Sequence, residues 1–342
     1  MIEVKNLVKD YGGHVAVNDV SFTIGEGEVV GFLGPNGAGK STTMNIITGY
    51  LSATSGSVTV DGYDTVEYPA EAKKRIGYLP EIPPLYTDMT VDEYLNFCYD
   101  LKKATLPRKP HLEEICRLVR IDDIRHRLIK NLSKGYRQRV GIAQALVGNP
   151  DVLILDEPTV GLDPMQIIEI RNLIAQLGKT HTVILSSHIL PEVQAVCERI
   201  LIINKGVIVA DGSAAELSHS LSQDHSLIAR IIGPKTEVLK LISTIRGVES
   251  VTATGVREGN AYEYKIMPVG DADIRKALFE RLADRHWPMV SLTSNELTLE
   301  EIFIKLASDE NTDFVLKSNE KAKKAVEESA EAEDEKEEED EE

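Results

Sequence analysis

The chain has 342 residues, of which 42% are hydrophobic, and its net charge at pH 7 is −17. This length predicts two domains rather than one, and the acidic balance disfavours a nucleic-acid binder, which normally carries a basic face. No apolar run approaches the roughly 18 residues that a membrane-spanning helix needs, and residues 1–10 lack the pattern of a secretory signal. Three widely spaced cysteines without a CxxC pair argue against zinc or disulfides. We therefore expect a cytoplasmic protein.

Residues 1–220 alternate short β-rich runs with helical stretches, which predicts an α/β domain with a parallel-sheet core. Three apolar runs are typical of buried parallel strands, namely residues 28–34, 151–157 and 182–187. The early β-rich segments 2–7 and 15–24 predict an antiparallel accessory sheet. Between about 88 and 148 the β-type runs disappear, so an inserted helical subdomain is expected there.

The remainder of the chain predicts a second domain and a tail. Residues 221–310 give the order strand, helix, strand, strand, helix, strand, followed by one more helix, and this order is typical of an α+β ferredoxin-like domain. Residues 311–342 contain few apolar side chains and end in a run of acidic ones. Such a segment buries too little surface to offset its ordering entropy, so we expect a disordered acidic tail.

The segment GPNGAGKST, residues 34–42, fits the Walker A pattern GxxxxGK[ST] between a predicted strand and a predicted helix. Its glycines, Gly34, Gly37 and Gly39, let the backbone curl so that successive amides face phosphate oxygens. Lys40 supplies a compact positive charge to the same oxygens, and Ser41 offers a hydroxyl to Mg²⁺. The nucleotide contacts predicted in this loop are Gly34, Asn36, Gly37, Ala38, Gly39, Lys40, Ser41 and Thr42.

Two adjacent acids, Asp156 and Glu157, end the apolar run VLILDE, as in a Walker B motif. We expect Asp156 to hold Mg²⁺ through water and Glu157 to polarise the attacking water as a general base. A pair of surface acids after any strand would look similar. Their position, 116 residues after Lys40 and before PTVGLDP, disfavours that alternative.

Residues 132–146, LSKGYRQRVGIAQAL, place Ser133 and Gly135 at a predicted helix start, where a hydroxyl and an unshielded amide suit an anion. The alternative is an ordinary helix in which Ser133 is only the cap. This segment resembles the LSGGQ signature of ABC ATPases. VGLD, with Asp163, resembles the D-loop of that family.

Three further residues take their expected roles from this resemblance. Tyr11 lies where the family places an aromatic ring against adenine, although a packed turn tyrosine is the alternative. His188 stands where the family carries the switch histidine that contacts the γ-phosphate, although a lone histidine is more often structural. Residues 76–86 resemble the Q-loop, with Glu81 in place of the usual Gln; its carboxylate can still reach Mg²⁺ or its water.

The signature also departs from the family pattern, because Lys134 and Tyr136 replace Gly and Gln. Together with Glu81 they resemble ATPase subunits of drug-, polysaccharide- and gliding-type exporters. The resemblance implies a P-loop ABC cassette that forms a head-to-tail homodimer around two ATP molecules. Walker A of one subunit would face Ser133 and Gly135 of the other.

In this interpretation ATP hydrolysis drives a separate membrane permease, and the chain is peripheral on the inner face of the cell membrane. The competing hypothesis is a soluble ABC ATPase that acts on nucleic acid or ribosomes, but such proteins usually carry two cassettes or long insertions. A cassette that binds nucleotide without turnover is disfavoured because Lys40, Asp156, Glu157 and His188 are all present. Residues 221–308 are expected to regulate or stabilise the dimer.

Overall fold

A computed structural model describes residues 1–221, 226–270, 272–294 and 298–307, and the predicted acidic tail, 311–342, lies outside these residues. The chain separates into two compact units. The first comprises Met1–Ala214 with the segment that begins at Phe303, and the second comprises Ala215–Ile302.

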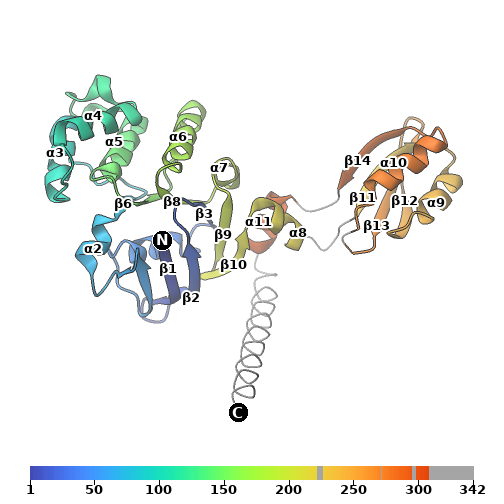
Figure 1. The fold of residues 1–342 in the computed structure, drawn as a ribbon, viewed down its shortest axis with the longest axis horizontal. Coiled ribbons are helices and arrows are strands. Elements are labelled where there is room, and N and C mark those ends of the chain that lie inside the picture. Colours follow the sequence, from blue (N-terminus) through green and yellow to red (C-terminus); the bar gives the residue numbers. More distant parts are fainter. Residues whose placement is uncertain (222–225, 271, 295–297, 308–342) are drawn as a thin grey trace, which may run out of the picture. The chain divides into compact units, whose positions relative to one another are not determined.

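The centre of the first unit is a six-stranded sheet with the strand order β10-β9-β3-β8-β7-β6 (Figure 1). All neighbouring strands are parallel except β10 and β9. Strands β7 and β8 are buried along their whole length, as expected for interior parallel strands. The bounds are β3 (Val29–Leu33), β6 (Ile76–Leu79), β7 (Val152–Asp156), β8 (Thr182–Ser187), β9 (Arg199–Asn204) and β10 (Val207–Gly212). The three predicted parallel strands are confirmed as β3, β7 and β8.

A second sheet of the first unit is antiparallel, with the order β2-β1-β4-β5, and confirms the predicted accessory sheet. Its strands are β1 (Ile2–Asp10), β2 (Val15–Ile24), β4 (Ser55–Val60) and β5 (Tyr63–Asp64). One hydrophobic cluster contains side chains from both sheets and from helix α1 (Lys40–Ile47). The two sheets and α1 therefore share a core, which fixes the start of α1 relative to the strand ends.

Residues 88–148 contain three α-helices and two short 3₁₀ helices (Figure 1). Helix α3 begins with a capping box, in which Thr90 Oγ1 accepts from Glu93 N at 3.2 Å and Glu93 Oε2 accepts from Thr90 N at 2.7 Å. Besides α1, the first unit contains the helices α2 (Pro69–Lys74), α3 (Val91–Leu101), α4 (Arg108–Leu118), α5 (Lys134–Leu146), α6 (Pro164–Leu177) and α7 (Leu190–Gln194). Helix α8 (Ala214–Leu221) lies at the division between the units. The 3₁₀ helices are Asp122–Ile124 and Ile129–Asn131.

The second unit contains a four-stranded antiparallel sheet with the order β12-β13-β11-β14. Helices α9 and α10 bury side chains such as Val238, Ile242 and Leu278 in one cluster with Tyr264 and Ile266 of the sheet. In chain order its elements are β11 (Leu227–Ile232), α9 (Lys235–Ser243), β12 (Val248–Glu258), β13 (Ala261–Pro268), α10 (Arg275–Asp284) and β14 (Met289–Ser294). Helix α11 (Leu299–Ala307) follows and crosses the division between the two units at Phe303. This is the element order predicted from the sequence.

Candidate functional site

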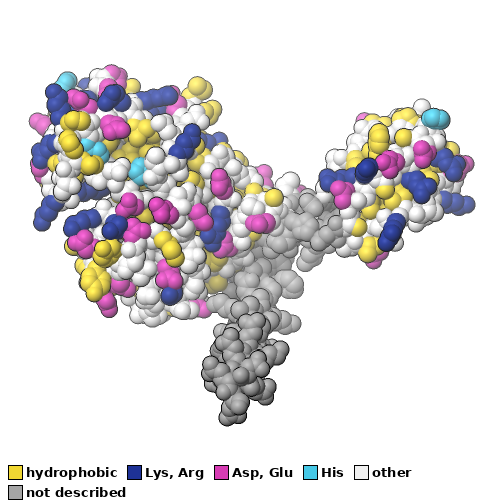
Figure 2. Space-filling view, viewed as in Figure 1, with side chains coloured by type: hydrophobic (Ala, Val, Ile, Leu, Met, Phe, Trp, Pro, Cys, Tyr) yellow, Lys and Arg dark blue, Asp and Glu magenta, His cyan; other side chains and the backbone are white. Residues whose placement is uncertain are grey.

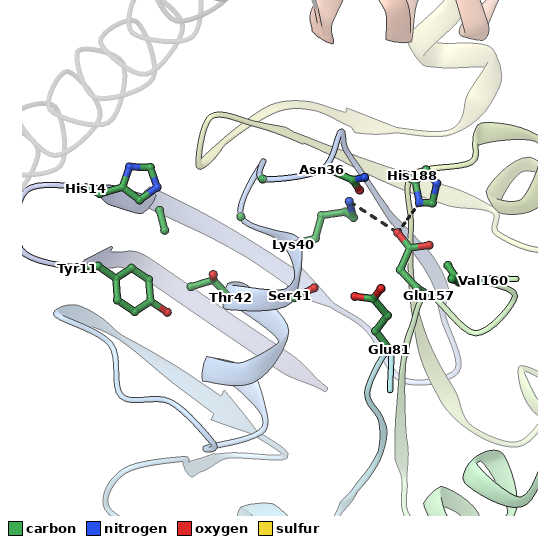
Figure 3. Close-up of a pocket in the computed structure, with 13 residues that line it drawn as sticks. Tyr11, His14, Asn36, Lys40, Ser41, Thr42, Glu81, Glu157, Val160 and His188 are labelled. Carbon is green, nitrogen blue, oxygen red and sulfur yellow. Dashed lines mark hydrogen bonds and ion pairs between the residues drawn. The ribbon is translucent and has the colours of Figure 1, made fainter. Parts of the chain in front are cut away.

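A cavity of about 570 Å³ lies at the carboxyl edge of the parallel strands in the first unit (Figure 3). Parallel strands bring the residues that follow them to one edge of the sheet, so segments far apart in sequence meet there. The lining residues are Tyr11, His14, Ala16, Asn36, Gly37, Gly39, Lys40, Ser41, Thr42, Glu81, Glu157, Val160 and His188. The structure thus brings together most of the residues predicted from the sequence.

The glycine-rich loop, residues 34–39, joins β3 to α1 and depends on its glycines for two reasons. Gly37 and Gly39 have φ of 81° and 108°, a backbone region that other residues rarely adopt. A Cβ at Gly39 would lie 2.5 Å from the carbonyl oxygen of Ala16, and one at Gly34 would lie 2.4 Å from that of Ile203. Gly34 therefore packs against β9 rather than lining the cavity, and Ala38 is also absent from the lining.

Lys40 begins α1 and is held from two sides. Its Nζ donates to the carbonyl oxygens of Gly34 at 2.7 Å and Pro35 at 3.2 Å, and it lies 3.8 Å from Glu157 Oε1. Burial lowers the pKa of Lys40, although the nearby carboxylates, Glu157 first, oppose this shift. The ammonium group of Lys40 thus lines the cavity and lies close to the carboxylates of Glu157, Asp156 and Glu81.

Asp156 and Glu157 are almost fully buried, with 2% and 5% exposure, at the end of β7. Oδ1 of Asp156 and Oε2 of Glu157 have no hydrogen-bond partner within the part of the chain that the structure describes. Glu157 lines the cavity, whereas Asp156 lines a neighbouring cavity together with Ser41 and Glu81. Buried polar atoms are nearly always paired, so these two oxygens are available to a bound group. Glu157 also has a φ of 49°, and its amide donates to the carbonyl oxygen of Ser186 at 2.9 Å.

His188 follows β8 and joins the same cluster. Its Nδ1 lies 2.8 Å from Glu157 Oε1, so one carboxylate oxygen contacts both His188 and Lys40 (Figure 3). The imidazole side chain is 38% exposed and lines the cavity. A basic group, a buried carboxylate and a solvent-accessible imidazole in contact can orient a water molecule and accept its proton.

Tyr11 and His14 lie on the opposite side of the glycine-rich loop from Glu157 (Figure 3). Tyr11 is 52% exposed, and Lys9 Nζ lies over one face of its ring, 5.2 Å from the ring centroid, so a stacked group would use the opposite face. His14 was not singled out from the sequence, nor were Ala16 and Val160. His14 lies in a turn closed by a 3.0 Å hydrogen bond from Tyr11 N to His14 O, and the strand pattern of the sequence does not specify this turn.

Glu81 follows β6 and lines the cavity. The glutamate that stands in place of the usual Q-loop Gln therefore faces the same space as Lys40 and Glu157. The described residues include no group of three or more His, Cys, Asp and Glu side chains that could hold a metal ion by themselves. Any cation in the cavity would therefore need hydroxyl or ligand oxygens as well.

Ser133 and Gly135 do not line this cavity. Ser133 is the N-cap of α5, and its Oγ accepts from Tyr136 N at 3.4 Å, so its capping role is observed. Gly135 is buried, and a Cβ there would lie 2.5 Å from Gln166 Oε1. Asp163, in the predicted D-loop, caps α6 by accepting from Gln166 N at 3.0 Å.

None of the helices in the described ranges is both long enough and apolar enough to cross a lipid bilayer.

Sequence comparison places this site in a known family. The family model described as ABC transporter matches residues 17–160. The linearmycin resistance ATP-binding protein LnrL of Bacillus subtilis is 34% identical over 311 residues, which cover 90% of this chain and 98% of LnrL. The ABC transporter ATP-binding protein NatA of B. subtilis is 42% identical over 210 residues, covering 60% of this chain and 85% of NatA. LptB, the ATP-binding protein of the Escherichia coli K12 lipopolysaccharide export system, is 36% identical over 221 residues, covering 63% of this chain and 92% of LptB.

The solved structures that resemble this chain include members of the same family. An ATP-binding subunit of an ABC transporter is 30% identical, with a TM-score of 0.60 over 64% of this chain and 92% of that one. The cassette MJ0796, solved as a dimer in a post-hydrolysis state with ADP and Pi, is 28% identical, with a TM-score of 0.57 over 62% of this chain and 98% of that one. The cassette, its glycine-rich loop and the two buried acids at the end of β7 are thus accounted for together: the chain belongs to the ATP-binding proteins of ABC transporters and is an ABC-type ATPase subunit.

Proposed function

We propose that the chain hydrolyses ATP in the 570 Å³ cavity and that two copies do so together to drive export through a separate membrane permease. The observation that carries this proposal is the contact of Glu157 Oε1 with both Lys40 and His188 beside two unpaired buried carboxylate oxygens. A cassette that binds nucleotide without hydrolysing it does not require a carboxylate in contact with both a lysine and a histidine.

The glycine-rich loop and Lys40 bind the phosphates. The amides of residues 34–42 and the Lys40 ammonium supply positive electrostatic potential at the start of α1. Asn36, Thr42 and the backbone at Ala38 belong to the same loop and helix start. Tyr11 stacks on the adenine ring, since its half-exposed ring lies at the other side of the cavity from Glu157.

Glu157 acts as the general base for the attacking water. Its carboxylate is buried, has one oxygen unpaired and has the other fixed by His188 at 2.8 Å. His188 keeps that oxygen in place and presents the rest of its half-exposed ring to the γ-phosphate. The two residues thereby share one task, which is to set the water in line with the phosphorus atom.

The cavity fits a magnesium ion that arrives with the nucleotide. Ser41 offers a hydroxyl and Glu81 a carboxylate on the wall of this cavity. Asp156 has a buried oxygen without a partner among the described residues, and it lies with Ser41 and Glu81 on the wall of the neighbouring cavity. Mg²⁺ prefers oxygen ligands and is commonly held by one or two protein groups together with phosphates and water. When bound, it neutralises charge that develops on the phosphate oxygens.

Dimerisation is proposed because Ser133 and Gly135 lie outside their own subunit's cavity. Ser133 is exposed at the start of α5, where helix amides favour an anion, so a second copy can present its nucleotide there. The dimeric structure of MJ0796 supports such pairing.

A second cavity in the first unit, of about 700 Å³, supports docking of the permease. Tyr50 and Ile82 line it with 82% of their surfaces exposed, and Ser41 and Asp156 lie on its wall. Exposed apolar side chains gathered in a hollow are typical of protein interfaces. A partner seated here would sense the occupancy of the neighbouring nucleotide cavity. This partner keeps the chain peripheral on the inner face of the membrane.

Transport is favoured over the alternative of an ATPase acting on nucleic acid. On the face of the first unit shown in Figure 2, the Lys and Arg side chains of the described residues lie among Asp and Glu rather than forming a continuous basic surface. Export is proposed because LptB is named for an export system and LnrL for linearmycin resistance.

We also propose the domain limits 1–220 for the cassette and 221–310 for a ferredoxin-like domain. Two observations support the latter: the β-α-β-β-α-β element order and the antiparallel strand order β12-β13-β11-β14. Its position in the chain supports a role in regulating or stabilising the dimer.

The test is an ATPase assay on purified wild type, Lys40→Ala and the exposed control Lys179→Ala. We expect activity in the wild type and in Lys179→Ala, and its loss in Lys40→Ala. Equal activity in all three would contradict the assigned site. Detergent co-purification of a membrane subunit, followed by transport measured in reconstituted vesicles, tests the permease and the direction.

A further inference from the structure

The segments that carry Glu157 and His188 are joined at two places, and the second lies outside the cavity. The first is the 2.8 Å contact between those two side chains. In the second, Thr159 Oγ1 donates a hydrogen bond to Glu192 Oε2. Thr159 lies two residues after Glu157, and Glu192 lies four residues after His188. Both are almost fully buried, with 4% and 3% exposure, and neither lines the cavity.

Helix α7, which carries Glu192, is seated firmly on the central sheet. Val193 is fully buried, and a Cβ added to Gly31 of β3 would lie 2.1 Å from Val193 Cγ1. The helix therefore packs directly on backbone, at the strand that leads into the glycine-rich loop. Such close packing leaves little freedom for the helix to move, so Glu192 is a fixed point.

The segment after β7 needs an external restraint. Glu157 has a φ of 49°, which is unfavourable for a residue with a side chain and persists only where the surroundings enforce it. The hydrogen bond from the Glu157 amide to the carbonyl oxygen of Ser186 restrains one end of the turn. A 3.1 Å hydrogen bond from Leu162 N to the carbonyl oxygen of Thr159 closes the other end. The hydroxyl of Thr159 adds a bond to an acidic side chain, and such bonds are stronger than neutral ones when the acceptor is ionised.

We propose that Thr159 and Glu192 form a positioning pair that fixes the carboxylate of Glu157 relative to His188 for attack on ATP. This inference rests on the proposed role of Glu157 as the general base. Neither member lines the cavity, so both act through Glu157 and His188. A small displacement of a base is costly, since a misplacement of about 1 Å can reduce the rate roughly a hundredfold.

The test compares substitutions that remove the hydrogen bond with others that keep it. Thr159→Val and Glu192→Ala remove it, whereas Thr159→Ser and Glu192→Gln retain a hydroxyl donor and an oxygen acceptor. We expect kcat to fall roughly tenfold to a hundredfold in the first two, with KM for ATP within about twofold of wild type. Thr159→Ser and Glu192→Gln should keep most of the activity. The double variant Thr159→Val/Glu192→Ala should be no slower than the worse single variant, because both remove one interaction.

A matched control separates positioning from stability. Thr182 is equally buried at the opposite end of β8, and its hydroxyl accepts from Gly27 N at 2.9 Å. Thr182→Val should lower the melting temperature but leave kcat close to wild type. The proposal is overturned if Thr159→Val and Glu192→Ala keep full kcat, if Thr182→Val slows turnover equally, or if Glu192→Gln is as slow as Glu192→Ala. Failure of the wild type to hydrolyse ATP would instead overturn the proposed function.

Discussion

Replacement of Glu157 by Gln tests the assignment of the general base most directly. The substitution keeps the size of the side chain but cannot accept the proton of the attacking water. General-base catalysis contributes about 10²- to 10⁴-fold, so kcat should fall by that factor, which corresponds to about 3 to 5 kcal/mol of barrier. His188, 2.8 Å away, keeps a polar neighbour, and the fold around β7 should therefore be preserved.

ATP binding should survive this substitution. At 3.8 Å and an effective dielectric constant of 20, the gross Coulomb attraction between Glu157 and Lys40 is about 4 kcal/mol. Its loss is offset because Lys40 keeps two carbonyl acceptors, and because removing a negative charge beside the phosphates favours their binding.

The assay for Glu157→Gln has three readouts. These are single-turnover hydrolysis, equilibrium ATP binding and size-exclusion elution with and without ATP. We expect slow hydrolysis, unimpaired binding and an ATP-dependent dimer, with the exposed Glu198→Gln variant behaving as wild type. Hydrolysis within about threefold of wild type would refute the role of Glu157 as the base. Monomeric elution at saturating ATP would refute the shared site at Ser133 and Gly135.

Three other perturbations have defined outcomes. Gly31→Ala places a Cβ 2.1 Å from Val193 Cγ1 and should lower the unfolding free energy by about 1–3 kcal/mol in urea denaturation; an unchanged midpoint would contradict this packing. Tyr11→Ala removes a stacking ring worth about 1–3 kcal/mol, so KM for ATP should rise roughly tenfold, and Tyr11→Trp should restore it. Glu81→Gln should make ATP binding less dependent on Mg²⁺, as measured by titration with and without a chelator; equal dependence in both proteins would place Glu81 away from the cation.

The parts of the fold that were predictable are those specified by local patterns. The strand, glycine-rich loop and helix around Lys40 follow from consecutive residues, and so do the buried strand and the acids at 156–157. The element order of the second unit was also readable, because each segment shows its own periodicity. The strand order of that unit could not be predicted, because β11 pairs with β13 and β14, which lie far along the chain.

Long-range contacts account for what the sequence analysis missed. Thr159 and Glu192 are 33 residues apart, and nothing near either residue marks it as a partner. Their hydrogen bond depends on the position of α7, which packs on Gly31, where the missing side chain leaves room for Val193. His14 is a simpler case, since it lines the cavity through a turn whose direction the strand pattern does not specify.

Glu81 shows why the charge of this cavity has to be considered as a whole. Burial lowers the pKa of Lys40, while Glu157, Asp156 and Glu81 all oppose that shift, so each carboxylate favours the charged ammonium. Among the described lining residues, Lys40 is the sole Lys or Arg. An incoming polyphosphate therefore meets one fixed cation and several carboxylates, and like charges at this range disfavour one another. A Gln at position 81 would remove one of these repulsions, whereas Glu81 retains it. Binding of ATP to this chain should thus require the divalent cation more strictly than binding to a cassette with Gln at that position.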